Sequence, residues 1–131
     1  MGMKSFGVGI SVKNIMEAVG FYEKIFGLES KNFDYFPEGH ECHGECMHAE
    51  LWKGDVHIFD VMGMEPNKHD FDAKKQIISF GAYFDSEAEL LEAFAQLSEG
   101  GIVKEPIGSV PWSPCCATVI DKHGITWWIS I

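Results

Sequence analysis

The sequence contains no arginine. All ten of its basic residues are lysines, and they stand against 20 aspartate and glutamate residues, which gives a formal net charge of −10. Without a guanidinium group, the chain has no planar fork with which to clamp a carboxylate or a phosphate. Nucleic acids are bound through basic patches, and this charge balance opposes such a patch. We therefore expect no nucleic-acid partner.

Long apolar runs are also missing. No stretch approaches the roughly 20 apolar residues that a membrane-spanning helix needs. The opening residues, MGMKSFGVGI, lack the charged-then-apolar layout of a signal peptide. We therefore expect no membrane partner and a cytoplasmic protein, in which the four cysteines are reduced thiols. The sequence also shows no glycine-rich phosphate loop and no nucleophile elbow.

Apolar residues suffice for one folded domain. The chain has 131 residues, of which 46% are hydrophobic, including ten phenylalanines and four tryptophans. A chain of this length can bury one substantial core, and this much apolar surface argues against disorder. We therefore treat residues 1–131 as a single domain.

The sequence reads as two copies of one unit. In the first copy, a strand over Phe6–Val12 leads into a helix that Asn14 caps and Gly27 ends. In the second copy, a strand over Ile77–Phe84 leads into a helix that Ser86 caps. Glu17 and Glu89 stand three residues after the caps, as in a capping box, and Gly100 and Gly101 end the second helix. The segments Gly9–Asn14 and Gly81–Ser86 align without gaps, which indicates an internal repeat.

Short strands follow each helix, so each copy has the order βαβββ. The predicted strands are 29–35, 46–52 and 55–61 in the first unit, and 102–105, 116–121 and 125–131 in the second. The units cover about residues 1–62 and 76–131, with a polar linker over about 63–75. The expected fold class is α+β: two curved mixed sheets around a cleft, with the helices outside.

Three stretches resemble a known family. They are FYEKIFG (residues 21–27), MHAEL (47–51) and the closing pattern DKxGxxW (121–127). With this arrangement of elements, the chain resembles the vicinal-oxygen-chelate superfamily of glyoxalases, bleomycin-resistance proteins and extradiol dioxygenases, and within it the PhnB-like group. The resemblance implies a small-molecule ligand and a homodimer. The function stays open, because one fold hosts unrelated chemistries.

The resemblance also implies where a divalent metal would be held in the cleft. The ligand positions of the superfamily fall on Gly7, Ser79 and Trp128, and the fourth falls near His57. Glycine and tryptophan offer no metal ligand, and serine is a poor one. We therefore expect the metal site of the relatives to be missing, and no cofactor.

An aromatic set then becomes the candidate ligand-binding site. Alternation along the last strand places Trp127 in the core and Trp128 toward the cleft. An indole at the position of a metal-binding carboxylate suits stacking on a planar ligand. The predicted ligand-binding residues are Trp128, Phe59, His57, Tyr83 and Trp112. The predicted function is binding of a small apolar or aromatic molecule in a metal-free cleft, as in bleomycin-resistance proteins.

Polar residues leave an alternative open. His48 and Glu50 share one strand face and could act as an acid–base pair, although a solvated sheet face is the commoner explanation for such a pair. Cys42, His43, Cys46 and His48 could hold a divalent metal such as zinc, although a polar loop that enters a strand explains them too. The alternative function is a metal-dependent isomerase, lyase, transferase or dioxygenase with a relocated site.

Overall fold

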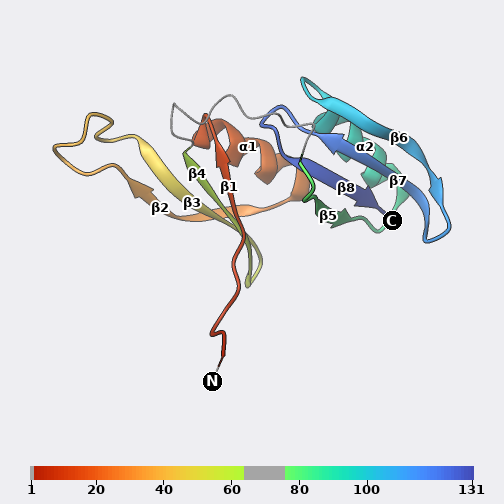
Figure 1. The fold of residues 1–131 in the computed structure, drawn as a ribbon, viewed down its shortest axis with the longest axis horizontal. Helices are drawn as coiled ribbons and strands as arrows, with labels where there is room; N and C mark the ends of the chain where they lie inside the picture. The colour runs from red at the N-terminus through yellow and green to blue at the C-terminus, as the bar shows by residue number, and fades with distance from the viewer. Residues whose placement is uncertain (1, 64–75) are drawn as a thin grey trace. The chain divides into compact units, whose positions relative to one another are not determined.

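A computed structural model describes residues 2–63 and 76–131 of the chain. The chain divides into two compact units, Met1–His69 and Asp70–Ile131, and each is described by itself (Figure 1). Each unit has the order βαβββ and forms one four-stranded mixed sheet with one helix, so the predicted α+β fold class is confirmed. The predicted linker over 63–75 lies outside the described residues, apart from Gly63 at the end of a strand.

The first unit holds one helix and four strands. The elements are β1 (Gly9–Val12), α1 (Ile15–Phe26), β2 (Glu29–Tyr35), β3 (Cys46–Lys53) and β4 (Val56–Gly63). The strands lie in the order β1-β4-β3-β2. Strand β1 runs parallel to β4, whereas the β4–β3 and β3–β2 pairs are antiparallel.

Helix α1 begins and ends where the sequence predicts. The side chain of Asn14 accepts a hydrogen bond from the backbone N–H of Glu17 at 3.1 Å. Gly27 ends the helix with φ at +63°, a left-handed conformation that glycine adopts without a steric penalty. Within the described residues, no helix has the length and apolarity to cross a membrane.

The core of the first unit lies between α1 and one face of its sheet. The helix buries Ile15, Ala18, Val19 and Tyr22. Alternate residues of β3 and β4 meet them, and these residues are Ala49, Leu51, Phe59 and Val61. Full burial of a valine, leucine, isoleucine or phenylalanine side chain contributes about 1.5–3 kcal/mol relative to its exposure. The other residues of these strands point to the opposite face, which no helix within the described residues 2–63 covers.

The second unit repeats this plan. Its elements are β5 (Phe80–Tyr83), α2 (Glu87–Ser98), β6 (Ile102–Val110), β7 (Ser113–Ile120) and β8 (Thr126–Ser130). The sheet order is β5-β8-β7-β6, with β5 parallel to β8 and the other pairs antiparallel. The side chain of Ser86 accepts from the N–H of Glu89 at 3.2 Å, as the predicted capping box requires. Leu90, Ala93 and Leu97 of α2 are buried.

Several strand boundaries differ from prediction, most of them by one or two residues, and the largest differences lie in β1, β5, β6 and β7. Strands β1 and β5 begin three residues later than expected, and the residues left outside them are exposed, with Phe6 at 79% and Ile77 at 99%. Strand β6 runs to Val110 instead of Glu105, because β7 begins at Ser113 and continues the ladder to a Val110–Ser113 pair. The register shifts around Pro106 let the hairpin tolerate a residue that cannot donate a backbone hydrogen bond.

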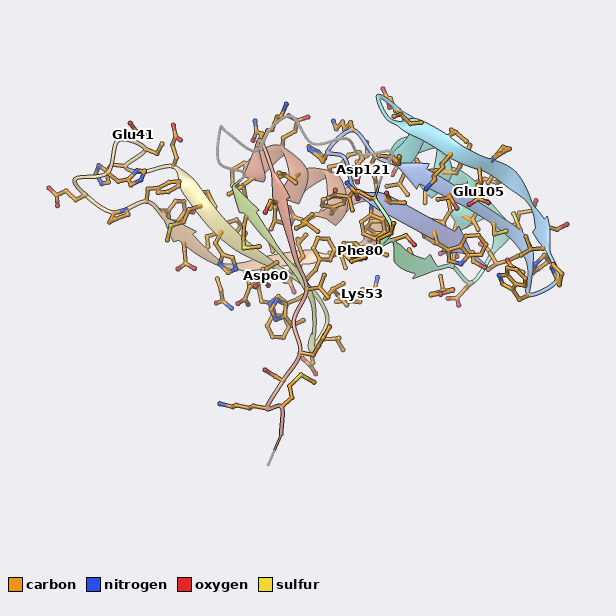
Figure 2. All side chains as sticks on the ribbon, in the orientation of Figure 1. Glu41, Lys53, Asp60, Phe80, Glu105 and Asp121 are labelled. Carbon is orange, nitrogen blue, oxygen red and sulfur yellow. The ribbon has the colours of Figure 1, made fainter. Side chains whose placement is uncertain are left out.

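The closing DKxGxxW pattern builds the turn between β7 and β8. The carboxylate of Asp121, labelled in Figure 2, is buried. Its Oδ1 accepts the backbone N–H groups of His123 and Ile125 at 2.9 and 3.1 Å, and its Oδ2 accepts the indole N–H of Trp127 at 2.8 Å. Gly124 has φ at +87°. The pattern therefore has a structural role: it fixes the turn and anchors Trp127 in the core.

Candidate functional site

Each unit has a sheet face that points away from its helix. The first helix-free face belongs to the β1-β4-β3-β2 sheet, and its polar residues are Asp34, His48, Glu50, Trp52, His57 and Asp60. The second helix-free face belongs to the β5-β8-β7-β6 sheet, and its residues are Gly81, Tyr83, Glu105, Thr118 and Trp128. Of the residues that the sequence nominates, the first face holds His48, Glu50 and His57, and the second holds Tyr83 and Trp128.

An imidazole bridges three strands of the first helix-free face. His48 on β3 places Nδ1 3.0 Å from Oδ2 of Asp34 on β2, and Nε2 3.0 Å from Oδ2 of Asp60 on β4. Asp60 also bonds Nε2 of His57 through its other oxygen. Asp60 projects from β4 in Figure 2. His48 and His57 are therefore both hydrogen-bonded to the carboxylate of Asp60.

The two carboxylates favour the protonated form of His48. A carboxylate can only accept, so both bonds are satisfied at once only when both ring nitrogens carry a proton. The hydrogen bond to Asp60 raises the pKa of His48 above its ordinary value, and the bond to Asp34 and the charges of both carboxylates act in the same direction. Partial burial of the ring opposes them.

Glu50 is held by two donors on the same face. The side-chain amide of Asn32 donates to Glu50 Oε1 at 2.7 Å, and the indole N–H of Trp52 donates to the same oxygen at 2.9 Å. These bonds favour the charged form and hold the pKa of Glu50 below its usual value. Asn32 has a left-handed φ of +53° where the β2–β3 register shifts, and this irregularity aims its amide at Glu50.

His57 reaches the first helix-free face through a β-bulge. Regular alternation would place His57 on the same side as Phe59, which faces α1. The β3–β4 register shifts between Leu51 and Trp52, so Trp52 pairs with His57. The two rings then stack, with centroids 4.9 Å apart and planes 9° from parallel. The Lys31 ammonium lies 4.8 Å from the Trp52 ring centroid on this face.

Ligand atoms of a metal-binding type converge on this face. One atom each from Glu50, His57 and Asp60 lies within 4.8 Å of the others. Within residues 2–63 and 76–131, the alternative set Cys42, His43, Cys46 and His48 does not gather in this way. Both ring nitrogens of His48 meet carboxylates, and the thiol of Cys46 donates to the His48 carbonyl oxygen at 3.4 Å.

The second helix-free face is aromatic. Gly81 on β5 pairs with Trp128 on β8, and Trp128 pairs with Thr118 on β7. The Tyr83 ring folds back over Gly81: a Cβ at Gly81 would lie 2.9 Å from its hydroxyl oxygen. Trp128 is half-buried and Tyr83 is 74% exposed, whereas Trp127 lies in the core. The Thr118 hydroxyl donates to Oε1 of Glu105 on β6 at 2.6 Å.

The remaining nominated residues lie elsewhere. Phe59 is 4% exposed and packs edge-to-face on Tyr22 of α1 with centroids 5.5 Å apart, so it belongs to the core of the first unit and not to a binding face. Alternation along β4 places Phe59 on the side of the sheet that faces α1. Trp112 is 77% exposed in the β6–β7 turn. His57 lies on the first helix-free face, in the other unit from Trp128 and Tyr83.

A family model of the Glyoxalase/Bleomycin resistance protein/Dioxygenase superfamily matches residues 6–129. The chain belongs to this superfamily. Among curated proteins, no sequence matches. The solved structures include a putative 3-demethylubiquinone-9 3-methyltransferase, a PhnB protein from Bacillus cereus, with a TM-score of 0.80 at 20% identity over 97% of this chain and 98% of that chain. The predicted resemblance to PhnB-like proteins is thereby confirmed at the level of the fold.

Two further structures share the fold of this superfamily member. A protein from Pseudomonas aeruginosa has a TM-score of 0.74 at 23% identity, over 96% of this chain and 97% of its own. The fosfomycin resistance protein FosX from Listeria monocytogenes, solved with Mn(II) and a dihydroxypropylphosphonic acid, has a TM-score of 0.67 at 11% identity, over 98% of this chain and 93% of its own. At these identities the likeness shows the fold alone.

Three of the superfamily's four metal positions hold residues that do not fit a metal. Gly9 pairs with Asp60 exactly as Gly81 pairs with Trp128, so the first-unit counterpart of Trp128 is Asp60 and not His57. Of the positions carried over by resemblance, Gly7, Ser79 and Trp128 supply no imidazole or carboxylate. The possible metal ligands that do lie close together are Glu50, His57 and Asp60, which belong to β3 and β4 of one sheet.

The sequence does not point to three residues of the first helix-free face, which are Asp34, Trp52 and Asp60. Asp34 and Asp60 have no motif around them, and their pairing with His48 depends on cross-strand register. Alternation along β4 is a sequence signal for Asp60. Asp60 shares a strand face with Ile58 and Met62, whereas the apolar Phe59 and Val61 point to the other face. Aligning β4 with β8 through the internal repeat would have placed Asp60 opposite Trp128 and drawn attention to it.

Proposed function

We propose that this superfamily member binds a small apolar or aromatic molecule on the second helix-free face, against Trp128 and Tyr83, without a metal ion. The observation that carries the proposal is the space above Gly81, which the Tyr83 ring occupies. Because Gly81 has no Cβ, the Tyr83 ring lies over the strand next to the one that bears Trp128. Two aromatic side chains are thereby presented on adjoining strands of one face.

The chemistry of this face suits a planar ligand. Aromatic rings add about 0.5–1.5 kcal/mol per stacked or edge-on pair beyond their area burial. Sites for small molecules combine such apolar surface with a few polar groups that fix orientation. Here Thr118 and Glu105 are those polar groups, and they follow Trp128 in register across β7 and β6.

Charge favours a cationic ligand. Glu105 lies two strands from Trp128, a separation of about 10 Å at ordinary strand spacing. The chain carries a net charge of −10 and no arginine. A molecule with a planar body against Trp128 and a positive group toward Glu105 fits this layout. Bleomycin resistance proteins in the name of the superfamily offer a precedent for binding.

Calorimetric titration with proflavine, a planar aromatic cation, tests the proposal. We expect Trp128→Ala to weaken binding at least tenfold and Tyr83→Ala to weaken it less. Trp52→Phe is the matched control, because Trp52 belongs to the other unit, and it should leave the affinity unchanged. Equal affinity in Trp128→Ala and the parent protein would contradict the proposal, as would strict dependence on added metal.

Trp112 needs a separate measurement. Its exposed ring lies in the β6–β7 turn, so we expect Trp112→Ala to change proflavine binding by less than Trp128→Ala does. A larger effect of Trp112→Ala would move the binding surface to the turn.

The proposed assembly is a homodimer. Exposed apolar side chains of the second unit, Ile77 and Ile78 among them, are the kind of surface that pairing covers. Sedimentation equilibrium should give twice the mass of the chain, and a monomer at micromolar concentration would contradict this assembly.

A further inference from the structure

The first helix-free face carries an arrangement that the proposed function does not use. We propose that Glu50, His57 and Asp60 form a binding site for a divalent transition-metal ion such as Zn²⁺ or Mn²⁺. The site lies wholly within the first unit, on β3 and β4. It shares no residue with the proposed ligand-binding face at Trp128, so either proposal can fail without the other.

The three donors are spaced for one ion after a small contraction. Their ligand atoms lie within 4.8 Å of one another. Ligands bound at about 2.0–2.2 Å from one ion lie roughly 3–4 Å apart. The most widely separated pair must therefore approach by about 1 Å, and the hydrogen bond between His57 and Asp60 must give way to the ion. The side chains of His57 and Asp60 are 37% and 29% exposed, so rotation about their side-chain bonds can supply this movement.

Neighbouring side chains already orient the donors. Trp52 stacks on the His57 ring and donates to Oε1 of Glu50, and Asn32 donates to that same oxygen. His48 bonds Oδ2 of Asp60. Partners of this type outside the ligand set fix the orientation of the ligands in metal sites. The β-bulge that turns His57 toward Asp60 is a further ordering feature.

The donor set indicates the class of metal. One imidazole with two carboxylates suits Zn²⁺, Mn²⁺, Fe²⁺ or Co²⁺ better than the all-oxygen shells that Ca²⁺ prefers. Three protein ligands leave at least one coordination position for water or an added molecule, which is the arrangement of catalytic rather than structural zinc sites. A cation would also offset the charge of Glu50 and Asp60 on one sheet face.

Mn²⁺ provides the first test, because manganese favours carboxylate and imidazole donors over thiolates. Titration of the full chain with MnCl₂, followed by electron paramagnetic resonance, should show one bound ion per chain. We expect Glu50→Gln, His57→Gln and Asp60→Asn each to weaken binding at least tenfold. The control variant Cys42→Ser, which changes the cysteine and histidine cluster, should bind like the parent. Parent-like binding in all three site variants would overturn the proposal, as would loss of binding in Cys42→Ser.

A second measurement needs no substitution in the site. The Trp52 indole N–H donates to Glu50, so an ion that draws Glu50 toward it should shift the indole nitrogen-15 and proton resonances of Trp52. Trp128, in the other unit, serves as the internal control, and its signal should stay in place. A titration with ZnCl₂ that leaves the Trp52 signal unmoved would overturn the proposal even if a variant failed to fold.

Discussion

The substitution Gly81→Ala separates ligand binding from stability. The new Cβ would lie 2.9 Å from the hydroxyl oxygen of Tyr83, 3.0 Å from Cε2 and 3.2 Å from Cζ. The nearest of these distances is too short for a carbon contact, so the Tyr83 ring must turn away. Tyr83 is 74% exposed, which leaves its ring room for that movement. The expected result is a folded protein that has lost one wall of its binding face.

The two effects have different sizes. Replacing glycine by alanine at a compatible position stabilises a protein by about 0.4–1 kcal/mol through the unfolded state. Displacing the Tyr83 ring costs about 0.5–1.5 kcal/mol if the ring leaves its preferred rotamer. The free energy of unfolding should therefore change by less than about 1 kcal/mol. Loss of one aromatic contact, at about 0.5–1.5 kcal/mol, should weaken proflavine binding by about 2- to 13-fold.

Urea unfolding and calorimetric titration with proflavine measure the two quantities. Gly9→Ala is the matched control, because Gly9 pairs with β4 as Gly81 pairs with β8. There the new Cβ would lie 2.5 Å from Cε of Met62, another flexible side-chain end. Gly9→Ala should leave proflavine binding unchanged. Equal affinity in Gly81→Ala and the parent, or equal weakening in both variants, would refute the role of the Tyr83 ring.

Three further substitutions test other features of the two units. Asp121→Ala removes the acceptor of three N–H donors, one of which is the indole of Trp127. It should lower the free energy of unfolding by about 3 kcal/mol or more in urea titrations. A loss below about 1 kcal/mol would contradict the structural role of the closing motif. Gly101→Ala would place a Cβ 2.2 Å from the backbone oxygen of Ile120, so thermal unfolding should show a loss of about 2 kcal/mol or more, and parent-like stability would contradict the packing of β6 on β7. His48→Gln tests the raised pKa of His48. The pKa of His48 is higher in the folded state than in the unfolded state. His48 therefore contributes stability that is fully present below pH 6.5 and is lost as the pH rises through the folded-state pKa. Denaturation in a chelator should therefore show a larger gap between parent and variant at pH 6 than at pH 9, and a gap that grows with pH would refute the bridge to Asp34 and Asp60.

The features that the sequence predicts well are local or repeated. Both helix starts follow from side-chain caps at Asn14 and Ser86, which act within three residues. The two βαβββ units follow from the internal repeat. The core position of Trp127 and the opposite orientation of Trp128 follow from simple alternation along β8.

The features that it predicts poorly depend on register between strands. The face on which His57 lies is decided by a bulge opposite Trp52, and single-strand alternation gives no sign of it. For the same reason, alternation along one strand does not identify the cross-strand partners of Asp34 and Asp60. It also does not show that Phe59 packs on Tyr22 instead of lining a binding face. Cross-strand partners are set by the whole sheet, so a reading along one strand does not contain them.

The indole nitrogen-15 spectrum, recorded with and without proflavine, tests the central proposal most directly. The four tryptophans give four indole signals, which single Trp→Phe variants assign. Binding on the second helix-free face predicts that proflavine shifts the Trp128 signal and leaves the signal of Trp52, in the other unit, in place. A shift of Trp52 with no change at Trp128 would contradict the account.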